Sequence, residues 1–178
     1  MTAIVRETRE TRVRVEIDRG TGAATIDTGI PFLDHMLVTL ARYASLNLAV
    51  TARGDLRHHV IEDVAIALGS GLAEVAAGPI TRYGECTLPM DDALVQVAVD
   101  VGGRPYYAGR LPGSLYDHWM RSFADHARIT LHVRVLRGRD RHHVIEAAFK
   151  ALGLALKQAL GPTGDTFSTK GPVSLGGG

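Results

Sequence analysis

The pentapeptide His58-His59-Val60-Ile61-Glu62 occurs a second time in the chain, as His142-His143-Val144-Ile145-Glu146. A long apolar run with helical periodicity follows each copy. An Asp-His pair also precedes each copy at nearly the same distance: Asp34-His35 stands 58 − 35 = 23 positions before the first copy, and Asp117-His118 stands 142 − 118 = 24 positions before the second. The pattern indicates two copies of one structural unit, each with three imidazoles and one carboxylate.

Helix geometry separates the two histidines of each pair. Neighbouring helical residues point about 100° apart, so His58 and His59 cannot easily bind one ion, whereas residues three or four apart share a face. Glu62 follows His59 by three positions, and Glu146 follows His142 by four. We therefore predict two different metal sites, and imidazole and carboxylate donors without thiolate suit Mn, Fe, Zn or Ni, with six-coordination favouring Mn or Fe. A single copy of the motif is equally well interpreted as a solvated polar patch, whereas its duplication favours metal binding.

The bulk composition indicates one domain, residues 1–178, built from two repeats at about 1–90 and 91–178. The chain has 178 residues, of which 46% are apolar, enough to bury one core. The formal net charge of +1 gives no reason to expect a nucleic-acid or membrane partner. The single cysteine, Cys86, excludes an internal disulfide and favours a reducing cytoplasm. We expect no signal segment and no membrane span, because the apolar runs are short.

Alternating and helical apolar patterns predict the same order of elements in both halves. We expect the first strand to form a hairpin with the second, and a short strand at 83–88 to link the halves. The predicted strands are 11–18, 23–28, 46–52, 83–88, 94–101, 104–111 and 129–136, and the predicted helices are 31–44, 58–77, 114–127 and 141–160. This order gives an α+β fold of two repeated β-β-α-β-α half-domains, with the helices packed between two small mixed sheets.

Several basic residues outside the repeat have two interpretations. Arg82, Arg104, Lys150 and Lys170 stand at the ends of elements or near a metal helix, and each alone is most often a solvated charge. Together they could grip a phosphate, because Arg offers a bidentate fork and Lys a point charge. Sequence alone leaves both interpretations open.

Two of the eight histidines fall outside the repeated pattern. His126 stands only 142 − 126 = 16 positions before the second pentapeptide, so the spacing favours His118 as the ligand. His132 lies in an alternating strand, where it is interpreted as a residue of the sheet face.

Further short segments occur in the same order as in a known family. They are Pro31–Met36, both pentapeptides, Arg82-Tyr83-Gly84, Pro89-Met90-Asp91, Gly103–Tyr106, Glu146–Ala151 and Ser168–Gly171. With this ordered set the chain resembles imidazoleglycerol-phosphate dehydratase over nearly its whole length. The resemblance implies the ribosomal protein S5 domain 2-like fold. It also implies a lyase that removes water from imidazole glycerol phosphate, giving imidazole acetol phosphate in histidine biosynthesis.

The resemblance also assigns roles to residues. It implies two Mn²⁺ ions per active site, one held by His58, His118, His142 and Glu146 and the other by His35, His59, Glu62 and His143. It implies proton transfer by Glu10 and a phosphate grip formed by Arg82, Arg104, Lys150, Ser168 and Lys170. A metal on the substrate's imidazole acts as a Lewis acid, so that the ring can expel the neighbouring hydroxyl. Because ligands in this family come from more than one subunit, we expect a cytoplasmic homo-oligomer, typically of twenty-four chains, with active sites between subunits.

Some features depart from the family pattern and keep other functions open. The loop Gly54–Arg57 and the connection from Tyr106 to His118 are shorter than is usual, and Gly102-Gly103-Arg104 replaces Ser-Gly-Arg. A metal-linked shell or metal buffer would use the same ligands without a substrate. A nucleic-acid-binding domain is disfavoured by the near-neutral charge and the lack of an aromatic stacking set.

Overall fold

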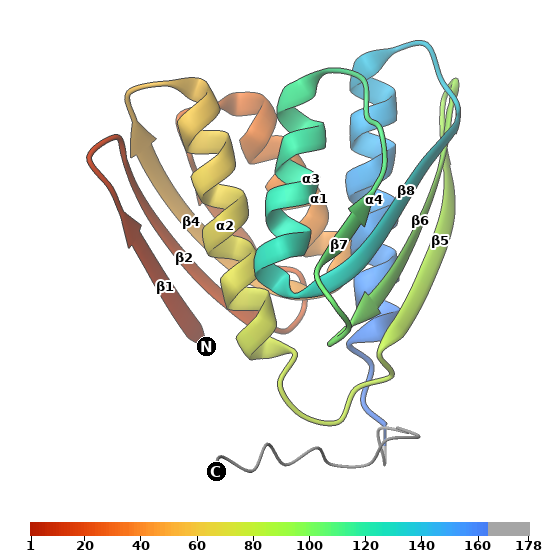
Figure 1. Cartoon of the computed structure of the whole chain (residues 1–178), viewed down its shortest axis with the longest axis horizontal. Coiled ribbons are helices and arrows are strands. Elements are labelled where there is room, and N and C mark those ends of the chain that lie inside the picture. Colours follow the sequence, from red (N-terminus) through yellow and green to blue (C-terminus); the bar gives the residue numbers. More distant parts are fainter. Residues whose placement is uncertain (164–178) are drawn as a thin grey trace, which may run out of the picture.

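The computed structural model describes residues 1–163, and its two mixed sheets and four helices confirm the α+β fold with repeated β-β-α-β-α units. The first half comprises β1 (Thr2–Glu7), β2 (Thr11–Arg19), β3 (Ala24–Asp27), α1 (Pro31–Ala44), β4 (Leu46–Gly54) and α2 (Arg57–Val75). The second half comprises β5 (Tyr83–Met90), β6 (Ala93–Val101), β7 (Tyr106–Ala108), α3 (Ser114–Ala127), β8 (Ile129–Arg137) and α4 (Arg141–Ala159). The two sheets form the outer sides of the molecule, and the helices fill the space between them (Figure 1).

The strand pairing differs from the prediction in both halves. The sheet orders are β1-β2-β4-β3 and β5-β6-β8-β7. The predicted hairpin of 11–18 with 23–28 is wrong, because β3 runs parallel to β4 while β2 pairs antiparallel with β4. Only three residues of the predicted strand 104–111 form β7, which is parallel to β8. Strand β5 is an outer strand of the second sheet, paired antiparallel with β6, and not a linker between the halves.

The Asn47 side chain explains why the first hairpin does not form. Its Oδ1 accepts hydrogen bonds from the backbone amides of Thr21, at 3.1 Å, and Ala23, at 3.2 Å. Gly22 between them has φ +87°, a conformation that favours glycine. These contacts hold residues 21–23 beside the start of β4, where the Leu48 amide donates a hydrogen bond to the Ala23 carbonyl oxygen at 2.8 Å. An alternating pattern identifies which face of a strand is buried, but it does not identify the neighbouring strand.

The helices pack across the two halves, α2 against α3 and α1 against α4. Glycines permit this close approach: a Cβ at Gly69 would stand 2.7 Å from the Phe123 carbonyl oxygen, and one at Gly153 would stand 3.1 Å from the Leu40 carbonyl oxygen. Trp119 stacks on Phe123 with 5.0 Å between ring centroids, and both rings are buried. The two halves therefore share one hydrophobic core.

All four helices begin at the same end of the molecule, the upper end in Figure 1. The topology requires this, because parallel strands β3 and β4 each lead directly into a helix, and β7 and β8 repeat the arrangement. A helix N-terminus carries partial positive charge, which stabilises nearby carboxylates.

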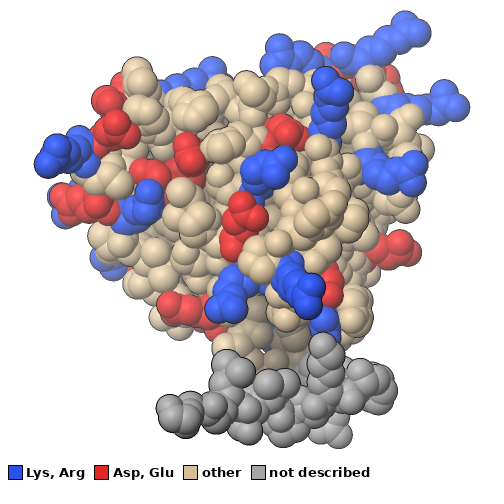
Figure 2. All heavy atoms as spheres, viewed as in Figure 1, with Lys and Arg blue, Asp and Glu red and all other residues tan. Residues whose placement is uncertain are grey.

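Both signs of charge occur on the face shown in Figure 2, with Lys and Arg interspersed among Asp and Glu. Basic side chains are prominent along the upper edge, which is the end where the helices begin. Within residues 1–163, no helix is long and apolar enough to cross a membrane.

Candidate metal centre

The first cluster of potential metal ligands joins the first turn of α1 to α4. His35 Nε2 lies 3.2 Å from Glu146 Oε2, and His142 Nε2 lies 3.0 Å from the same oxygen. Helical spacing produces the second contact, because His142 and Glu146 are four residues apart. The other carboxylate oxygen, Glu146 Oε1, lies 2.8 Å from Lys150 Nζ. One oxygen of Glu146 thus faces two imidazoles, and the other faces an ammonium group.

Glu146 is ionised although its side chain is only 9% exposed. Burial by itself raises the pKa of a carboxyl group. Hydrogen bonds from Lys150, His35 and His142 outweigh the burial and hold the pKa of Glu146 at about 2. A buried carboxylate that is charged at neutral pH and stands beside two imidazoles is a suitable donor set for a divalent cation.

The second cluster joins α2 to the first turn of α3. Glu62 Oε1 lies 3.1 Å from His118 Nε2, and Glu62 Oε2 lies 3.5 Å from His58 Nε2. The ring centroids of His58 and His118 are 5.5 Å apart. His118 Nε2 is buried but makes no hydrogen bond within residues 1–163, because its contact with Glu62 lacks hydrogen-bonding geometry. The buried nitrogen therefore lies close to the Glu62 carboxylate but has no hydrogen-bonding partner in the described residues.

His59 and His143 lie in different surroundings, against acidic side chains. His59 Nδ1 lies 2.9 Å from Asp55 Oδ1 and 3.4 Å from Glu10 Oε2. His143 Nδ1 lies 2.8 Å from Asp92 Oδ1. Hydrogen bonds with these aspartates raise the pKa of His59 and of His143 above the usual value for imidazole. Their rings stand nearly perpendicular to those of the preceding histidines, at 90° and 83°.

The structure separates the two histidines of each pair, as helix geometry predicts, but it groups Glu62 differently. Glu62 lies beside His58 and not beside His59, which stands only three residues before it. The physical reason is that a four-residue step returns to within about 40° of the starting direction on a helix, whereas a three-residue step misses by about 60°. Glu146 lies beside His142, four residues before it, in agreement with the spacing.

The division of the ligands that the resemblance implied is therefore not the division found within one chain. The resemblance grouped His58 and His118 with Glu146, and it grouped His35 with Glu62. The described residues place three ligand atoms within 4.8 Å of one another in each of two separate sets, His35–His142–Glu146 and His58–Glu62–His118. A third set contains Glu10, Asp55 and His59.

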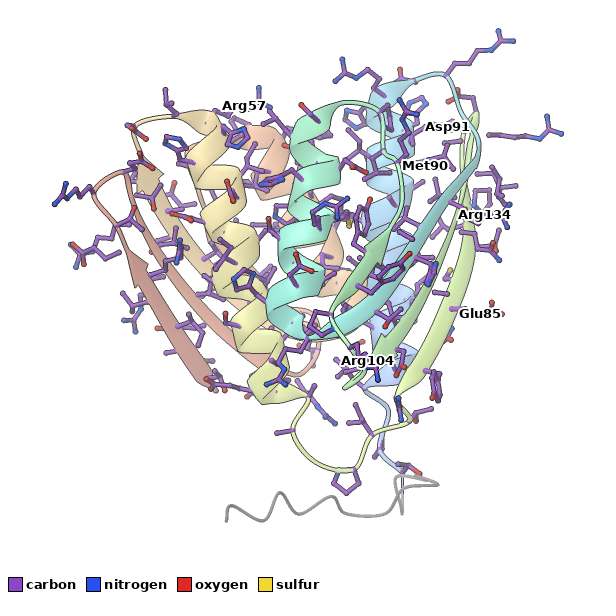
Figure 3. All side chains as sticks on the ribbon, viewed as in Figure 1. Arg57, Glu85, Met90, Asp91, Arg104 and Arg134 are labelled. Atoms are coloured by element: carbon purple, nitrogen blue, oxygen red, sulfur yellow. The ribbon has the colours of Figure 1, made fainter. Side chains whose placement is uncertain are left out.

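The expected phosphate grip does not come together in one chain. Arg82 precedes β5 and forms a two-point ion pair with Asp100, at 2.6 and 3.1 Å. Lys150 Nζ lies 3.6 Å from Met90 Sδ, at the other end of β5, next to the first cluster. Strand β5 has eight residues and spans roughly 25 Å. Arg104 lies at the lower end of the molecule and Met90 at the upper end (Figure 3). The remaining expected members, Ser168 and Lys170, lie outside the described residues.

Sequence analysis does not identify Asp55 and Asp92 as partners of the histidines. Helical spacing could have identified Asp55 as a partner of His59, since Asp55 stands four residues before it. Asp92 carries no such signal, because it is 51 residues from His143. Its Oδ2 also accepts the backbone amide of Arg139 at 2.6 Å, so it joins the β5–β6 turn to the start of α4. Hydrogen bonds from these backbone amides and from His143 hold the pKa of Asp92 far below its usual range.

The two histidines outside the repeat lie away from both clusters. His126 Nδ1 contacts the Ser122 carbonyl oxygen at 2.9 Å in the last turns of α3. His132 lies on β8 beside the Tyr106 ring, with 5.7 Å between ring centroids. Neither belongs to a group of potential metal ligands in the described part of the chain.

Comparison with known proteins gives consistent matches. The family model described as imidazoleglycerol-phosphate dehydratase matches residues 28–156. The imidazoleglycerol-phosphate dehydratase of Methanoculleus marisnigri is 48% identical, over 94% of this chain and 96% of that protein. The protein of the same name from Kineococcus radiotolerans is 46% identical, over 89% of this chain and 90% of that protein.

Solved structures match the fold as well. The crystal structure of IGPD from Pyrococcus furiosus in complex with (S)-C348 aligns with a TM-score of 0.85 and 38% identity, covering 96% of this chain and 100% of that chain. The crystal structure of imidazoleglycerol-phosphate dehydratase from Staphylococcus aureus aligns with a TM-score of 0.80 and 33% identity, covering 92% of this chain and 100% of that chain.

Proposed function

The chain belongs to the imidazoleglycerol-phosphate dehydratase family, and from this premise we propose that it removes water from imidazole glycerol phosphate to give imidazole acetol phosphate in histidine biosynthesis. The reaction is that of a hydro-lyase. The observation that carries the proposal is the pair of clusters, each with two imidazoles and a carboxylate, on the repeated pentapeptides. A cation in either cluster would be able to contact the imidazole ring of the substrate.

We propose that each cluster holds a metal ion, with Mn²⁺ as the expected metal and two ions per active site. One ion would bind His35, His142 and Glu146, and the other would bind His58, Glu62 and His118. The donor set fits, because imidazole with carboxylate and no thiolate suits Mn²⁺. The buried Nε2 of His118, which makes no hydrogen bond within residues 1–163, supports the fit independently. When bound, the ions supply Lewis acidity to the imidazole of the substrate.

We propose that His59 and His143 complete the two metal sites of neighbouring copies of the chain. Neither histidine belongs to the cluster formed by its helical neighbour. Asp55 and Asp92 contact Nδ1 of these rings, at 2.9 and 2.8 Å, and thereby orient the opposite nitrogen, Nε2, for a ligand. One active site would then take His35–His142–Glu146 from one chain and His58–Glu62–His118 from another.

The separation of the basic residues supports the same assembly. Arg82 and Lys150 lie at opposite ends of β5, so no single chain can bring both to one phosphate group. We therefore propose a cytoplasmic homo-oligomer, twenty-four chains in the expected form, whose active sites lie between copies. In these sites Arg82, Arg104, Lys150, Ser168 and Lys170 would hold the phosphate of the substrate.

Side chains of the protein itself would bind and orient the substrate and transfer a proton. Elimination requires a proton to leave a carbon atom and a hydroxyl group to depart. Glu10 is the proposed proton-transfer group, because its carboxylate is 58% exposed and lies 3.4 Å from His59, at the edge of the site. Lys150 fixes one oxygen of Glu146 and so directs the other toward the two histidines.

The proposal is tested by adding imidazole glycerol phosphate to purified protein loaded with Mn²⁺. Imidazole acetol phosphate is the expected product. His142→Asn removes a cluster ligand and should abolish turnover, whereas the matched control His132→Asn, on an exposed strand position, should leave it unchanged. An intact wild-type assembly that forms no product with any divalent metal between pH 6 and 9 would contradict the proposed activity.

A further inference from the structure

The aspartates of the two Asp-His pairs precede the ligand histidines but are not ligands themselves. Within residues 1–163, Asp34 and Asp117 belong to none of the groups of potential metal ligands. They occupy equivalent places, because each is the fourth residue of its helix, α1 or α3, and directly precedes His35 or His118. Both helices begin at the upper end of the molecule (Figure 1). The partial positive charge of a helix N-terminus stabilises a carboxylate there, but both aspartates also have specific hydrogen-bonding partners.

Asp34 holds the loop between β3 and α1. Its Oδ1 accepts one hydrogen bond from the backbone amide of Thr28, at 2.9 Å, and another from the Thr28 hydroxyl, at 2.5 Å. Thr28 is buried and directly follows the last residue of β3. The two hydrogen bonds therefore join the end of this strand to the first turn of the helix.

Asp117 holds the longer loop between β7 and α3 in the same way. Its Oδ1 accepts a hydrogen bond from the backbone amide of Leu111, at 2.8 Å, and one from the Tyr107 hydroxyl, at 2.7 Å. Leu111 and Tyr107 are both buried. A Cβ at Gly109 would stand 2.5 Å from the Tyr107 hydroxyl oxygen, so the glycine leaves the space in which this hydroxyl reaches Asp117.

The two loops reach one arrangement with different residues. The amide donor stands six positions before the aspartate in both halves, since 34 − 28 = 6 and 117 − 111 = 6. The hydroxyl donor is Thr28 in the first half and Tyr107 in the second. The N-cap residues of these helices, Ile30 and Gly113, provide no side-chain cap. The aspartates therefore hold helix starts that lack the usual capping hydrogen bond.

These helix starts matter because each supplies the third ligand of a cluster. The pentapeptide helix supplies the other two, four residues apart, and helix geometry fixes their separation. His35 reaches Glu146 from α1, at 3.2 Å. His118 reaches Glu62 from α3, at 3.1 Å. Because helix ends fray most readily, the place of each imidazole depends on what holds the first turn of its helix.

We propose that Asp34 and Asp117 are positioning residues, each of which holds the first turn of its helix so that the next residue, a histidine, reaches the ligand pair on the neighbouring helix. The inference rests on the proposed metal binding. It differs from a general structural role in one measurable respect. Each aspartate should affect the ion that its own histidine binds and should leave the other ion unchanged.

The test equilibrates the Mn²⁺-loaded protein with a series of chelator buffers that fix the free Mn²⁺ concentration, and counts the bound ions by elemental analysis. The wild type should hold two ions per chain. Asp117→Ala should weaken one ion about tenfold, the size expected for a residue that orients a metal ligand, and Asp34→Ala should weaken the other. Asp117→Asn and Asp34→Asn keep an Oδ1 acceptor and should restore most of the affinity.

Double variants separate positioning from general damage to the fold. His118→Asn should lose one ion, and adding Asp117→Ala to it should leave the remaining ion as tightly bound as before. Adding Asp117→Ala to His35→Asn should weaken the ion that His35→Asn retains. Asp125→Ala, an exposed substitution on the same helix as Asp117, should bind both ions like the wild type.

A milder variant keeps the test decisive if Asp117→Ala does not assemble. Tyr107→Phe removes one of the two donors to Asp117 and should weaken the same ion about threefold. Equal weakening of both ions by the aspartate variants, or of neither, would overturn the inference while leaving the metal sites in place. A wild type that binds no ion, or histidine variants that keep both ions, would contradict the proposed metal sites and the inference with them.

Discussion

The two clusters use the same pentapeptide but differ in how their carboxylates are held. In the second copy Glu146 is 9% exposed, and one of its oxygens is occupied by Lys150. In the first copy Glu62 is 34% exposed, and both of its oxygens face imidazoles, at 3.1 and 3.5 Å. A repeated motif therefore determines which side chains lie together. The residues around the motif determine how buried each carboxylate is and which partners its oxygens have in the metal-free protein.

Three positions around the pentapeptides, all offset by 84, differ between the two copies. Lys150 of the second copy corresponds to Ile66 of the first, so only Glu146 has an ammonium partner. Asp63 of the first copy corresponds to Ala147 of the second, so only the first copy carries a buried carboxylate against its sheet. Asp140, which caps α4, corresponds to Leu56, which cannot cap α2. Each difference can be tested by exchanging the residues.

The largest effect is expected from neutralising the glutamate carboxylate that both copies of the pentapeptide contain. Glu146→Gln and Glu62→Gln each keep the size of the side chain but remove the charge that a divalent cation needs. Each should lower turnover by about a thousandfold and remove one of two bound ions per chain, because both metals are proposed to serve one active site. Activity assays with elemental analysis check this. Retention of both ions in either variant would show that the carboxylate is not a ligand.

The next largest effect is expected from Asp63, which only the first half possesses. Its Oδ1 accepts a hydrogen bond from Arg6 at 2.8 Å, its Oδ2 accepts one from the Thr11 hydroxyl, and Asp63 and Thr11 are both buried. Asp63→Ala copies the second half but leaves these partners unsatisfied, and should lower the free energy of unfolding by about 2–3 kcal/mol. Urea unfolding measures the loss. The exposed control Asp125→Ala should change stability by less than about 0.5 kcal/mol, and an equal loss in both variants would contradict a specific role for the buried network.

Lys150→Ile, which copies Ile66, should change the pH dependence of stability. Because the pKa of Glu146 is lowered from 4.5 to about 2, its ionisation stabilises the fold above pH 4.5, and this contribution is lost as the pH falls toward 2. Removing Lys150 leaves burial less opposed and raises the pKa of Glu146, so the loss should begin at a higher pH. The expected decrease at pH 7 is about 1–2 kcal/mol. Metal-free unfolding between pH 2 and 7 provides the measurement, and an unchanged profile would contradict the assigned ion pair.

The smallest effect is expected from the helix caps. The Asp140 side chain accepts the backbone amides of His142, at 2.7 Å, and His143, at 3.4 Å. Asp140→Ala should cost about 1 kcal/mol, and Leu56→Asp should gain about 0.5–1 kcal/mol by supplying the missing cap of α2. Thermal unfolding of the metal-free variants measures both. A gain at Leu56 without a loss at Asp140 would contradict the view that capping is what distinguishes these helix starts.

The repeat in the sequence predicts the fold class and the proximity of the ligands, because helical spacing and duplication act over short distances. His142 with Glu146 follows from a four-residue step, and the alternation of strands identifies the buried faces. Strand partners are not predicted, because the position of β3 beside β4 depends on Asn47, a contact between separate segments. The grouping of Glu62 with His118 and the pairing of Asp92 with His143 likewise depend on how helices and turns from different parts of the chain meet.

The most direct test of the shared-site account is subunit mixing between two inactive variants. His142→Ala removes one cluster and His58→Ala removes the other, so each homogeneous assembly should be inactive. If an active site takes one cluster from each of two chains, equal mixing by unfolding and reassembly should restore roughly a quarter of wild-type activity, since random assembly pairs the two intact clusters at one interface in four. Mixed assemblies that form normally but stay inactive would contradict the proposal that neighbouring chains complete one active site.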